Sequence, residues 1–312
     1  MAKASDSLEY KTIAKQQLRR LDDGSIELCS VKRDIASSEQ PLQLVLHYVD
    51  FNVPAEKHVW LEQELALLMR TPGDDKALVL GFLYTQGIIA KLTDIESLDF
   101  SEPNTVEIRL AKTVAVDFEQ LQRHFPSHSG CGICGQSQLK QLGLSYPAFE
   151  GGEAWLVANE LFTAPERLRE LQLQFQSTGG CHGVGLLKLD SLGRFGFAAV
   201  AEDVGRHNAL DKVIGNIFEN ATPVEHTALV FSGRVSFELV QKAVVAGISV
   251  ILSIGAPSDL AIATAQQFNM TLIGFIRDGQ ANVYHDAGRL SGVAQNTAEK
   301  EQKAQEKGIG NR

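Results

Sequence analysis

Residues 227–276 read TALVFSGRVSFELVQKAVVAGISVILSIGAPSDLAIATAQQFNMTLIGFI and decide the fold class of this chain. Three apolar runs in this stretch are short enough to be buried strands. They are Thr227–Phe231, Ile248–Ile254 and Thr271–Ile276. Between them, Val235–Ala246 and Ser258–Phe268 have the apolar spacing of helices. Strands that alternate with helices in this way indicate an α/β domain with a parallel or mixed sheet covered by helices.

The same pattern extends in both directions from this stretch. Thr163-Ala-Pro165-Glu166 has the composition of a capping box with proline at the first helical position, which predicts a helix from Thr163 to Gln176. Three further strands and one further helix are predicted around it. They are strands Val184–Leu189, Phe195–Ala201 and Ala281–Tyr284, the last returning antiparallel, and helix Gly205–Phe218. We therefore assign residues 137–293 to one α/β domain.

The first part of the chain has a different pattern. Residues 39–125 predict a small α+β domain, and its expected elements alternate less regularly. They are strand Leu42–Tyr48, helices Trp60–Arg70 and Asp75–Gln86, and strand Val106–Leu110. Residues 1–38 are a polar arm with a possible first strand, residues 126–136 are a loop, and residues 294–312 are expected to be a disordered tail.

Composition excludes several classes of protein. The 312 residues carry a formal net charge of −9 at pH 7, which is the wrong sign for a nucleic-acid-binding protein. The chain begins without the apolar core of a secretory signal, and its most apolar run is broken well short of the roughly 20 residues that span a bilayer. Only four cysteines occur. We therefore expect a cytoplasmic protein without structural disulfides.

Two of the four cysteines stand together as Cys131-Gly-Ile-Cys134 in the glycine- and serine-rich loop. One interpretation is half of a structural zinc site, with His124 and His128 as the other half. A zinc deaminase does not fit, because no proline precedes Cys131. The other interpretation is a thiol whose pKa is lowered by the Cys-x-x-Cys setting and which attacks or carries sulfur.

The loops that follow the predicted parallel strands suggest a ligand crevice. They read Ser232-Gly-Arg234, Gly255-Ala-Pro-Ser258 and Arg277-Asp-Gly-Gln280. Ligands of open α/β sheets bind at the carboxyl ends of the strands, and the guanidinium groups of Arg234 and Arg277 suit phosphate oxygens. The plainer interpretation is that tight turns need small residues. The dinucleotide fingerprint and the P-loop are both absent from the sequence.

Two other motifs have both a structural and a functional interpretation. Glu202–Lys212 concentrates charged residues at the end of a strand and the start of a helix. A solvated helix face explains such a run, but Arg206 and His207 at a helix start point to an anion or a partner. Cys181-His182 follows Thr178-Gly-Gly180, where a buried core cysteine is the commoner outcome.

Taken together, these motifs resemble the formate dehydrogenase accessory sulfurtransferase family (FdhD/NarQ). The resemblance covers about residues 30–292. The matching segments are Arg70-Thr-Pro-Gly73, Leu80-Gly-Phe-Leu83, Gly87-Ile-Ile89, Cys131-Gly-Ile-Cys-Gly135, Thr178-Gly-Gly180, Glu202–Lys212 and Ser232-Gly-Arg-Val-Ser-Phe-Glu238. One departure is Cys181-His182, where a pattern closer to Gly-Gly-x-His-Ala is expected.

The resemblance implies a three-layer α/β/α, cytidine-deaminase-like domain with a smaller N-terminal α+β domain, usually as a homodimer. It implies a sulfurtransferase that takes sulfur from a cysteine desulfurase and passes it to the molybdenum bis(molybdopterin guanine dinucleotide) cofactor of formate dehydrogenase. Cys131 is then expected to hold the persulfide and Cys134 to assist. The cofactor segment corresponds to Phe275, Ile276, Arg277, Asp278, Gly279 and Gln280. The crevice argument points independently to Arg277 and to Arg234.

Two alternatives stay open at this point. A chaperone could hold the cofactor without covalent chemistry, in which case Cys131 would be dispensable and Arg277 would not. A structural zinc protein would instead bind stoichiometric metal.

Overall fold

The computed structural model describes residues 10–51, 59–116, 139–140 and 142–292. A six-stranded sheet forms its centre, with strand order β11-β10-β12-β13-β14-β15. These strands are β10 (His182–Leu189), β11 (Phe195–Asp203), β12 (Thr227–Phe231), β13 (Val250–Ser253), β14 (Thr271–Arg277) and β15 (Gln280–His285). Strands β12, β13 and β14 are parallel, and the other pairings are antiparallel. The mixed α/β sheet and the antiparallel last strand are therefore confirmed.

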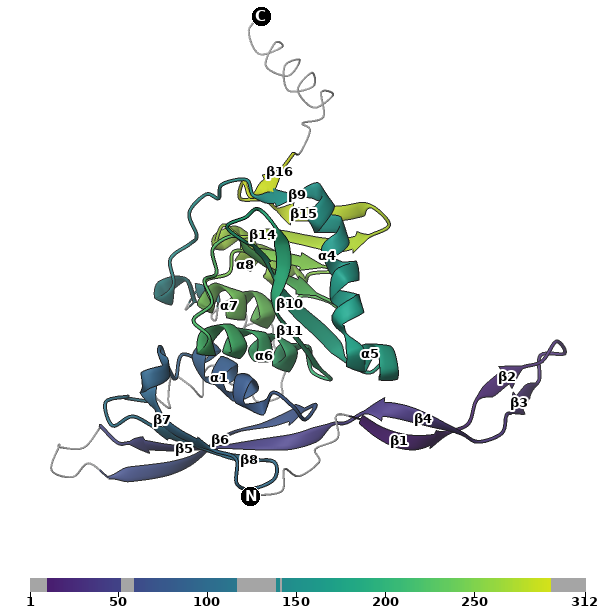
Figure 1. Ribbon diagram of the computed structural model, residues 1–312, viewed down its shortest axis with the longest axis horizontal. Helices are drawn as coiled ribbons and strands as arrows, with labels where there is room; N and C mark the ends of the chain where they lie inside the picture. Colours follow the sequence, from purple (N-terminus) through teal and green to yellow (C-terminus); the bar gives the residue numbers. More distant parts are fainter. Residues whose placement is uncertain (1–9, 52–58, 117–138, 141, 293–312) are drawn as a thin grey trace, which may run out of the picture.

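Helices cover both faces of this sheet (Figure 1). One face packs against α6 (Arg206–Glu219), α7 (Phe237–Val245) and α8 (Asp259–Gln267), and the other against α4 (Ala158–Leu171). Alternate residues of β12 belong to different cores. Leu229 lies in the core under α6 and α7, and Val230 in the core under α4. This period-two alternation of fully apolar residues is expected of a strand buried on both faces.

The predicted helix from Thr163 starts earlier than expected. Helix α4 begins at Ala158, so Pro165 lies inside it, and the hydroxyl of Thr163 donates to the carbonyl of Asn159 instead of capping a terminus. The reason is burial, because Leu161 and Leu168 occupy one face at helical spacing. After Gln172 the chain turns into the short helix α5 (Leu173–Thr178).

A second sheet, of order β6-β5-β8-β7, is formed by the N-terminal part of the chain. Its strands are β5 (Gln40–Val49), β6 (Trp60–Arg70), β7 (Ile95–Asp99) and β8 (Thr105–Leu110), with the one-turn 3-10 helix η2 (Leu92–Asp94) before β7. Helix α1 (Asp75–Thr85) packs on this sheet and also on α6. Backbones meet closely at this helix crossing, since a Cβ at Gly81 would overlap the carbonyl of Asp211.

The predicted helix Trp60–Arg70 is wrong, because this segment is strand β6. It pairs with β5 along its whole length, from Gln40 opposite Arg70 to Val49 opposite Trp60. A bulge leaves Leu65 without a partner residue in the register. One extra residue breaks the period-two alternation of a strand and produces an apolar spacing that imitates a helix.

Residues 10–37 form a ribbon that projects from the body of the molecule (Figure 1). It contains two antiparallel pairs, β1 (Tyr10–Lys15) with β4 (Lys32–Ser37), and β2 (Leu18–Arg20) with β3 (Ile26–Leu28). A further short parallel pair, β9 (Leu156–Val157) with β16 (Leu290–Ser291), ties the start of α4 to the end of the described chain. None of the described helices is both long and apolar enough to cross a membrane.

Candidate functional site

A cavity of about 680 Å³ opens at the carboxyl ends of β12, β13 and β14. Its floor is made by residues from these strand ends, namely Phe231, Ser232, Ile254 and Ile276. Arg277, Asp278 and Gly279 line its rim and are exposed. The cavity is of the size that small-molecule sites usually have, roughly 300–1,000 Å³. It lies where the crevice argument predicts a ligand.

Only some of the predicted cofactor-binding residues line the cavity. Ile276 and the three residues after it line the cavity, whereas Phe275 and Gln280 do not. Phe275 has a φ of 54°, a left-handed conformation that costs energy for a bulky residue, and its N–H donates to the carbonyl of Gly255 at 3.2 Å. Backbone strain of this kind gathers at functional sites, so its position next to the cavity-lining segment is consistent with a role there.

Arg234 lies beside the cavity and not in its wall. The loop that carries it contacts the next loop, because Ser253 donates its hydroxyl hydrogen to the carbonyl of Gly233, and Val235 bridges to Pro257. The strand-end loops therefore support one another. Cys131 and Cys134, the predicted catalytic residues, lie outside the described residues, and their roles stay predictions.

The wall opposite the strand ends comes from α4 and α5 and was missed by the sequence analysis. Phe162, Arg169, Gln172 and Phe175 line the cavity from this side. The guanidinium of Arg169 lies 4.9 Å from the centre of the Phe175 ring, a cation–π contact. An aromatic residue and an arginine on an amphipathic helix are the available sequence signal, but periodicity does not say which sheet edge they face.

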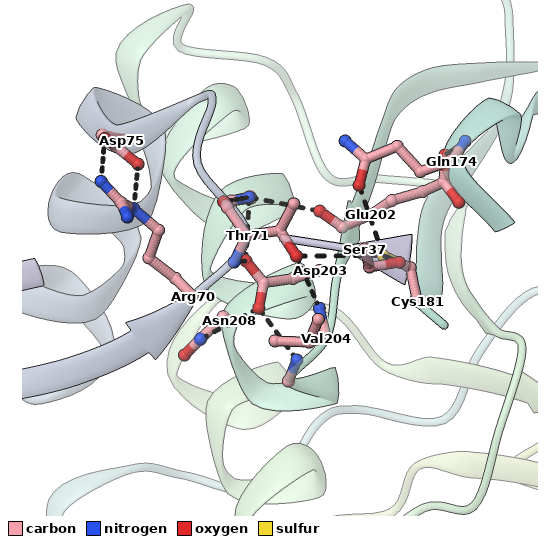
Figure 2. Close-up of polar contacts among 12 residues, drawn as sticks. Ser37, Arg70, Thr71, Asp75, Gln174, Cys181, Glu202, Asp203, Val204 and Asn208 are labelled. Atoms are coloured by element: carbon pink, nitrogen blue, oxygen red, sulfur yellow. Dashed lines mark hydrogen bonds and ion pairs between the residues drawn. The ribbon is translucent and has the colours of Figure 1, made fainter. Parts of the chain in front are cut away.

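Cys181 and His182 also line the cavity. Cys181 is only 5% exposed, and its sulfur lies 3.1 Å from Ser37 Oγ and 3.3 Å from Gln174 Oε1, either of which is placed to accept its single proton (Figure 2). Burial raises the pKa of Cys181, and this outweighs the hydrogen bonds that Ser37 and Thr71 contribute. The group is therefore a neutral hydrogen-bond donor at pH 7, not a thiolate nucleophile.

We expect Cys181 to react slowly with alkylating reagents. Native protein treated with N-ethylmaleimide at pH 7.5 should label Cys181 at least about tenfold more slowly than the more exposed Cys29, because the thiolate is the reactive form. Peptide mass spectrometry at successive times measures both rates within one sample. Equal rates for the two cysteines would contradict the neutral, enclosed thiol.

His182 stands among positive charges. Burial lowers the pKa of His182 below its ordinary value, and the charges of Arg206 and Arg234 lower it further. The Nε atom of Arg206 is buried without a hydrogen-bond partner among the described residues. The nearby carboxylate of Asp203 acts in the opposite direction on this pKa, but it is already paired with Lys212. The two arginines therefore favour an anion at this edge of the sheet.

His207 is the exception in this basic group, because it has an acidic neighbour. Its Nε2 lies 3.8 Å from Glu238 Oε2 and 3.3 Å from Ser236 Oγ. The neighbouring His207 lowers the pKa of Glu238 to about 2, so Glu238 is ionised at any physiological pH. His207 is thereby held by α7 and is less available to a ligand than the arginines.

The charged Glu202–Lys212 motif is mainly structural (Figure 2). Glu202 accepts hydrogen bonds from the N–H groups of Gln174 and Phe175, both at 2.8 Å, and so caps the first turn of α5. This contact holds the helix that provides one wall of the cavity. The solvated-face interpretation is wrong for Glu202, whose carboxylate positions another element.

Asp203 and Lys212 form a buried ion pair of 2.9 Å, with side chains 0% and 2% exposed. Thr71 donates its N–H to Asp203 at 3.0 Å, and its carbonyl accepts from Lys212 at 2.9 Å. Asn208 donates to Asp203 at 3.1 Å and to the carbonyl of Met69 at 2.7 Å. The motif therefore joins the segment after β6 to the central α/β unit.

A second buried ion pair reinforces the same junction. Lys242 donates to both carboxylate oxygens of Asp211, at 2.8 and 2.9 Å, and to the hydroxyl of Thr85 at the end of α1. Helices α1, α6 and α7 are thus linked through one fully hydrogen-bonded charge pair, which is the arrangement that makes burial of charge tolerable.

Within the ranges that the structure describes, no three His, Cys, Asp or Glu side chains come together as a metal site. The zinc hypothesis concerns Cys131 and Cys134, which lie outside those ranges, and it stays a prediction.

Comparison with known proteins places the chain among relatives. The FdhD/NarQ family matches residues 53–291. The sulfur carrier protein FdhD of Streptomyces coelicolor is 34% identical over 289 residues, which cover 89% of this chain and 95% of that protein. The protein of the same name from Saccharolobus solfataricus is 38% identical over 229 residues, covering 73% of this chain and 84% of its own.

A solved structure shares the fold. It belongs to a proposed formate dehydrogenase accessory protein from Desulfotalea psychrophila, with a TM-score of 0.64, 22% identity, and coverage of 89% of this chain and 99% of that one. The family match spans well over half of the chain, and the sequence relatives are matched across most of their lengths. The chain therefore belongs to the FdhD/NarQ family.

Proposed function

We propose that this protein is a sulfur carrier that accepts a persulfide sulfur on Cys131 and transfers it to the molybdenum bis(molybdopterin guanine dinucleotide) cofactor needed by formate dehydrogenase. The observation that carries the proposal is the 34% identity to a sulfur carrier protein over 95% of that protein's length. The described fold adds a cavity at the sheet edge, lined by the segment that the family resemblance assigns to the cofactor.

The apolar lining of the cavity suits the uncharged part of a ligand, and its two arginines, Arg169 and Arg277, are the cations available to phosphate groups beside the carboxylates of Glu166 and Asp278. Its inner surface includes the buried Leu168, Phe231 and Ile276, and its rim carries the exposed Arg277. Phosphate groups keep their favourable interaction with guanidinium and water at the rim, because burying a charge in an apolar site is costly. A guanine dinucleotide end of the cofactor has this division between a neutral base and charged phosphates.

The sulfur chemistry balances with the two loop thiols. The Cys131 thiolate attacks the terminal sulfur of a desulfurase persulfide, which forms a new S–S bond and releases the desulfurase thiolate. The Cys134 thiolate then attacks the Cys131 sulfur, forming a disulfide between the two cysteines and releasing hydrosulfide to the metal. A cellular dithiol reduces that disulfide and returns both thiols.

The proposal includes partners and a location. A cysteine desulfurase supplies the sulfur, formate dehydrogenase receives the sulfurated cofactor, and the chain works as a cytoplasmic homodimer. Nucleic acid and membrane play no part. The cytidine-deaminase-like relationship of the α/β unit belongs to the same proposal.

Formate dehydrogenase activity in bacteria that lack their own family member tests this function. The wild-type gene should restore activity, and Cys131→Ala should not, with equal amounts of each protein confirmed by immunoblot. Under the non-covalent chaperone hypothesis, Cys131→Ala should restore formate dehydrogenase activity, because a chaperone needs the cavity and not the thiol. Restored activity with Cys131→Ala, and loss with Arg277→Ala, would replace the sulfur carrier by the chaperone. Zinc content of the purified protein tests the remaining alternative.

Arg277→Ala should weaken the binding of guanosine diphosphate, a soluble probe of one end of the cofactor. A hydrogen bond to a charged group is worth about 1.5–3 kcal/mol, so we expect affinity to fall about ten- to a hundredfold. Arg194→Ala is the matched control, since Arg194 is exposed and pairs with Asp190 in the turn between β10 and β11. Isothermal titration calorimetry at fixed salt measures both. Equal affinities for the two variants would contradict a phosphate contact at Arg277.

A further inference from the structure

The tip of the ribbon, formed by β2, β3 and the turn between them, has one apolar face. Leu18 lies opposite Leu28, and Ile26 follows Leu28 on the same face. Leu18 and Ile26 are each 68% exposed, and Leu28 is 60% exposed. The opposite face carries the ion pair of Arg19 with Glu27. A two-stranded hairpin is marginally stable alone in water, so an uncovered apolar face on one indicates a contact with another molecule.

The turn of the tip is a specific structure and not a loose end. The N–H of Gly24 donates to the carbonyl of Leu21 at 3.0 Å, and Gly24 has the positive φ that such a turn needs. The carboxylate of Asp23 accepts from both the N–H and the hydroxyl of Ser25, at 2.8 and 2.6 Å. The apolar face is therefore presented in a fixed form.

A groove of about 330 Å³ lies beside the base of the ribbon. Its apolar lining includes Leu171 and Leu173, which are 49% and 69% exposed, and Phe197 of β11. Helix α5 contributes Leu173 to this groove and also holds the ribbon base, where the hydroxyls of Thr178 and Ser37 are hydrogen-bonded at 2.6 Å. The chain thus has two uncovered apolar patches, at opposite ends of one ribbon (Figure 1).

The charges of the ribbon and the groove are complementary. Residues 10–37 hold six lysines and arginines against four acids, although the whole chain has a net charge of −9. The groove carries the carboxylates of Glu202 and of the exposed Asp74, while its Lys212 is already neutralised by a buried aspartate. Arg20 lies on the apolar face of the tip, where it meets these carboxylates when the apolar patches come together.

We propose that two copies of this chain exchange their ribbons, so that the tip of each ribbon binds in the groove beside the base of the other. The inference rests on the homodimer of the proposed function and names its interface. A single copy cannot make this contact, because its tip projects away from its own groove (Figure 1). Two-fold symmetry requires the contact to be made twice, and ribbons that lie antiparallel side by side satisfy this requirement.

Leu28→Glu tests the tip. It places a carboxylate in the apolar contact and opposite the acidic groove, and it does so twice in each dimer. We therefore expect the dimer dissociation constant to rise at least about a hundredfold. Gln17→Glu is the matched control, because it adds the same charge to the same hairpin at an exposed position that alternates with Leu18. This variant should dimerise as the wild type does.

Leu173→Glu tests the groove independently of the tip. It should raise the dimer dissociation constant by a similar factor, since it adds negative charge where the partner's apolar face binds. Leu192→Glu is the matched control, because Leu192 is just as exposed but lies in the turn between β10 and β11. Both leucines are on the surface, so circular dichroism should show that both variants fold.

Cross-linking tests the antiparallel arrangement. Cys29 follows Leu28 in the tip, and Leu173→Cys introduces a thiol in the groove. A short bis-maleimide should join these two thiols between copies, as linked peptides found in the band of doubled mass. A link from Cys29 to Cys29 would place the two tips together and overturn the proposed exchange.

Sedimentation velocity of the full-length protein and the four glutamate variants, over a wide range of concentration, decides the matter. A wild-type dimer that dissociates in Leu28→Glu and Leu173→Glu, but not in the two controls, supports the exchange. A wild-type monomer, or a dimer that persists in both test variants, overturns it. The sulfur adduct on the wild type is measured separately, so an adduct on a monomer overturns this inference and leaves the sulfur carrier in place.

Discussion

Lys212→Met lowers the free energy of unfolding by about 3–5 kcal/mol, because it leaves the Asp203 carboxylate buried without its cation. The two side chains are 2.9 Å apart and essentially inaccessible to water. Lys212 also donates to the carbonyls of Thr71 and Glu202, so the variant loses these contacts as well. Urea denaturation followed by circular dichroism measures the change.

Lys76→Met is the matched control for this prediction. Lys76 pairs with Glu219, and its side chain is 58% exposed. An exposed pair of this kind is worth no more than about 1 kcal/mol. Adding Asp203→Asn to Lys212→Met should recover part of the lost stability, since it removes the uncompensated charge while retaining an acceptor for the Thr71 N–H. Similar losses for Lys212→Met and Lys76→Met would show that the buried pair does not hold the junction together.

The second large effect concerns the loop thiols. Cys131→Ala should take up no sulfur when incubated with an active cysteine desulfurase and cysteine, whereas the wild type gains an adduct of about 32 Da, the mass of one persulfide sulfur. Cys181→Ser should gain the adduct as the wild type does, because Cys181 is enclosed and its pKa is raised by burial. Cys134→Ala should also load, since Cys134 acts in release.

Intact-protein mass spectrometry under non-reducing conditions measures the adduct on the wild type and on the three variants in parallel. An adduct retained by Cys131→Ala and lost by Cys181→Ser would reverse the assignment and move the chemistry into the cavity. An adduct absent from the wild type, with the desulfurase shown to release sulfur, would favour the cofactor-holding chaperone.

Most of the central fold was predictable because its strands are buried on both faces. Runs such as Thr227–Phe231 are apolar throughout, and the helices between them have one apolar face, so periodicity and length agree. The prediction failed at Trp60–Arg70, where the bulge at Leu65 removed the alternation that identifies a half-buried strand. The predicted start of α4 was also too late. The capping-box composition at Thr163 suggested a helix start there, whereas the helix begins at Ala158 and buries Leu161.

The candidate site was predictable on one side only. Sheet topology places the ends of parallel strands at one edge, which is why Ile276 and Arg277 could be expected at a cavity. The wall from α4 and α5 depends on how a helix packs across the sheet, and local sequence does not contain that information. Gln172 in particular has no motif around it in the sequence. It is noticed only in the structure, where its side chain is buried and its Nε2 has no hydrogen-bond partner among the described residues.

The Glu202–Lys212 motif shows how a conspicuous charge pattern is misread from sequence. Arg206 and His207 at a helix start pointed to an anion or a partner. The structure uses the carboxylates beside them for other contacts, with Glu202 capping α5 and Asp203 holding Lys212 and the segment after β6. Arg206 keeps a buried Nε without a hydrogen-bond partner among the described residues, and its charge lowers the pKa of the neighbouring His182. Charge in a sequence identifies a polar cluster, and burial decides whether that cluster binds a ligand or joins two elements.

Sulfur delivery tests the central claim most directly. Protein loaded with ³⁵S from labelled cysteine and a desulfurase, freed of both and then incubated with the molybdenum cofactor and apo-formate dehydrogenase, should lose its label to the cofactor of the enzyme as formate oxidation appears. Label that stays on the protein, or activity that appears with unloaded Cys131→Ala, would contradict a covalent sulfur carrier.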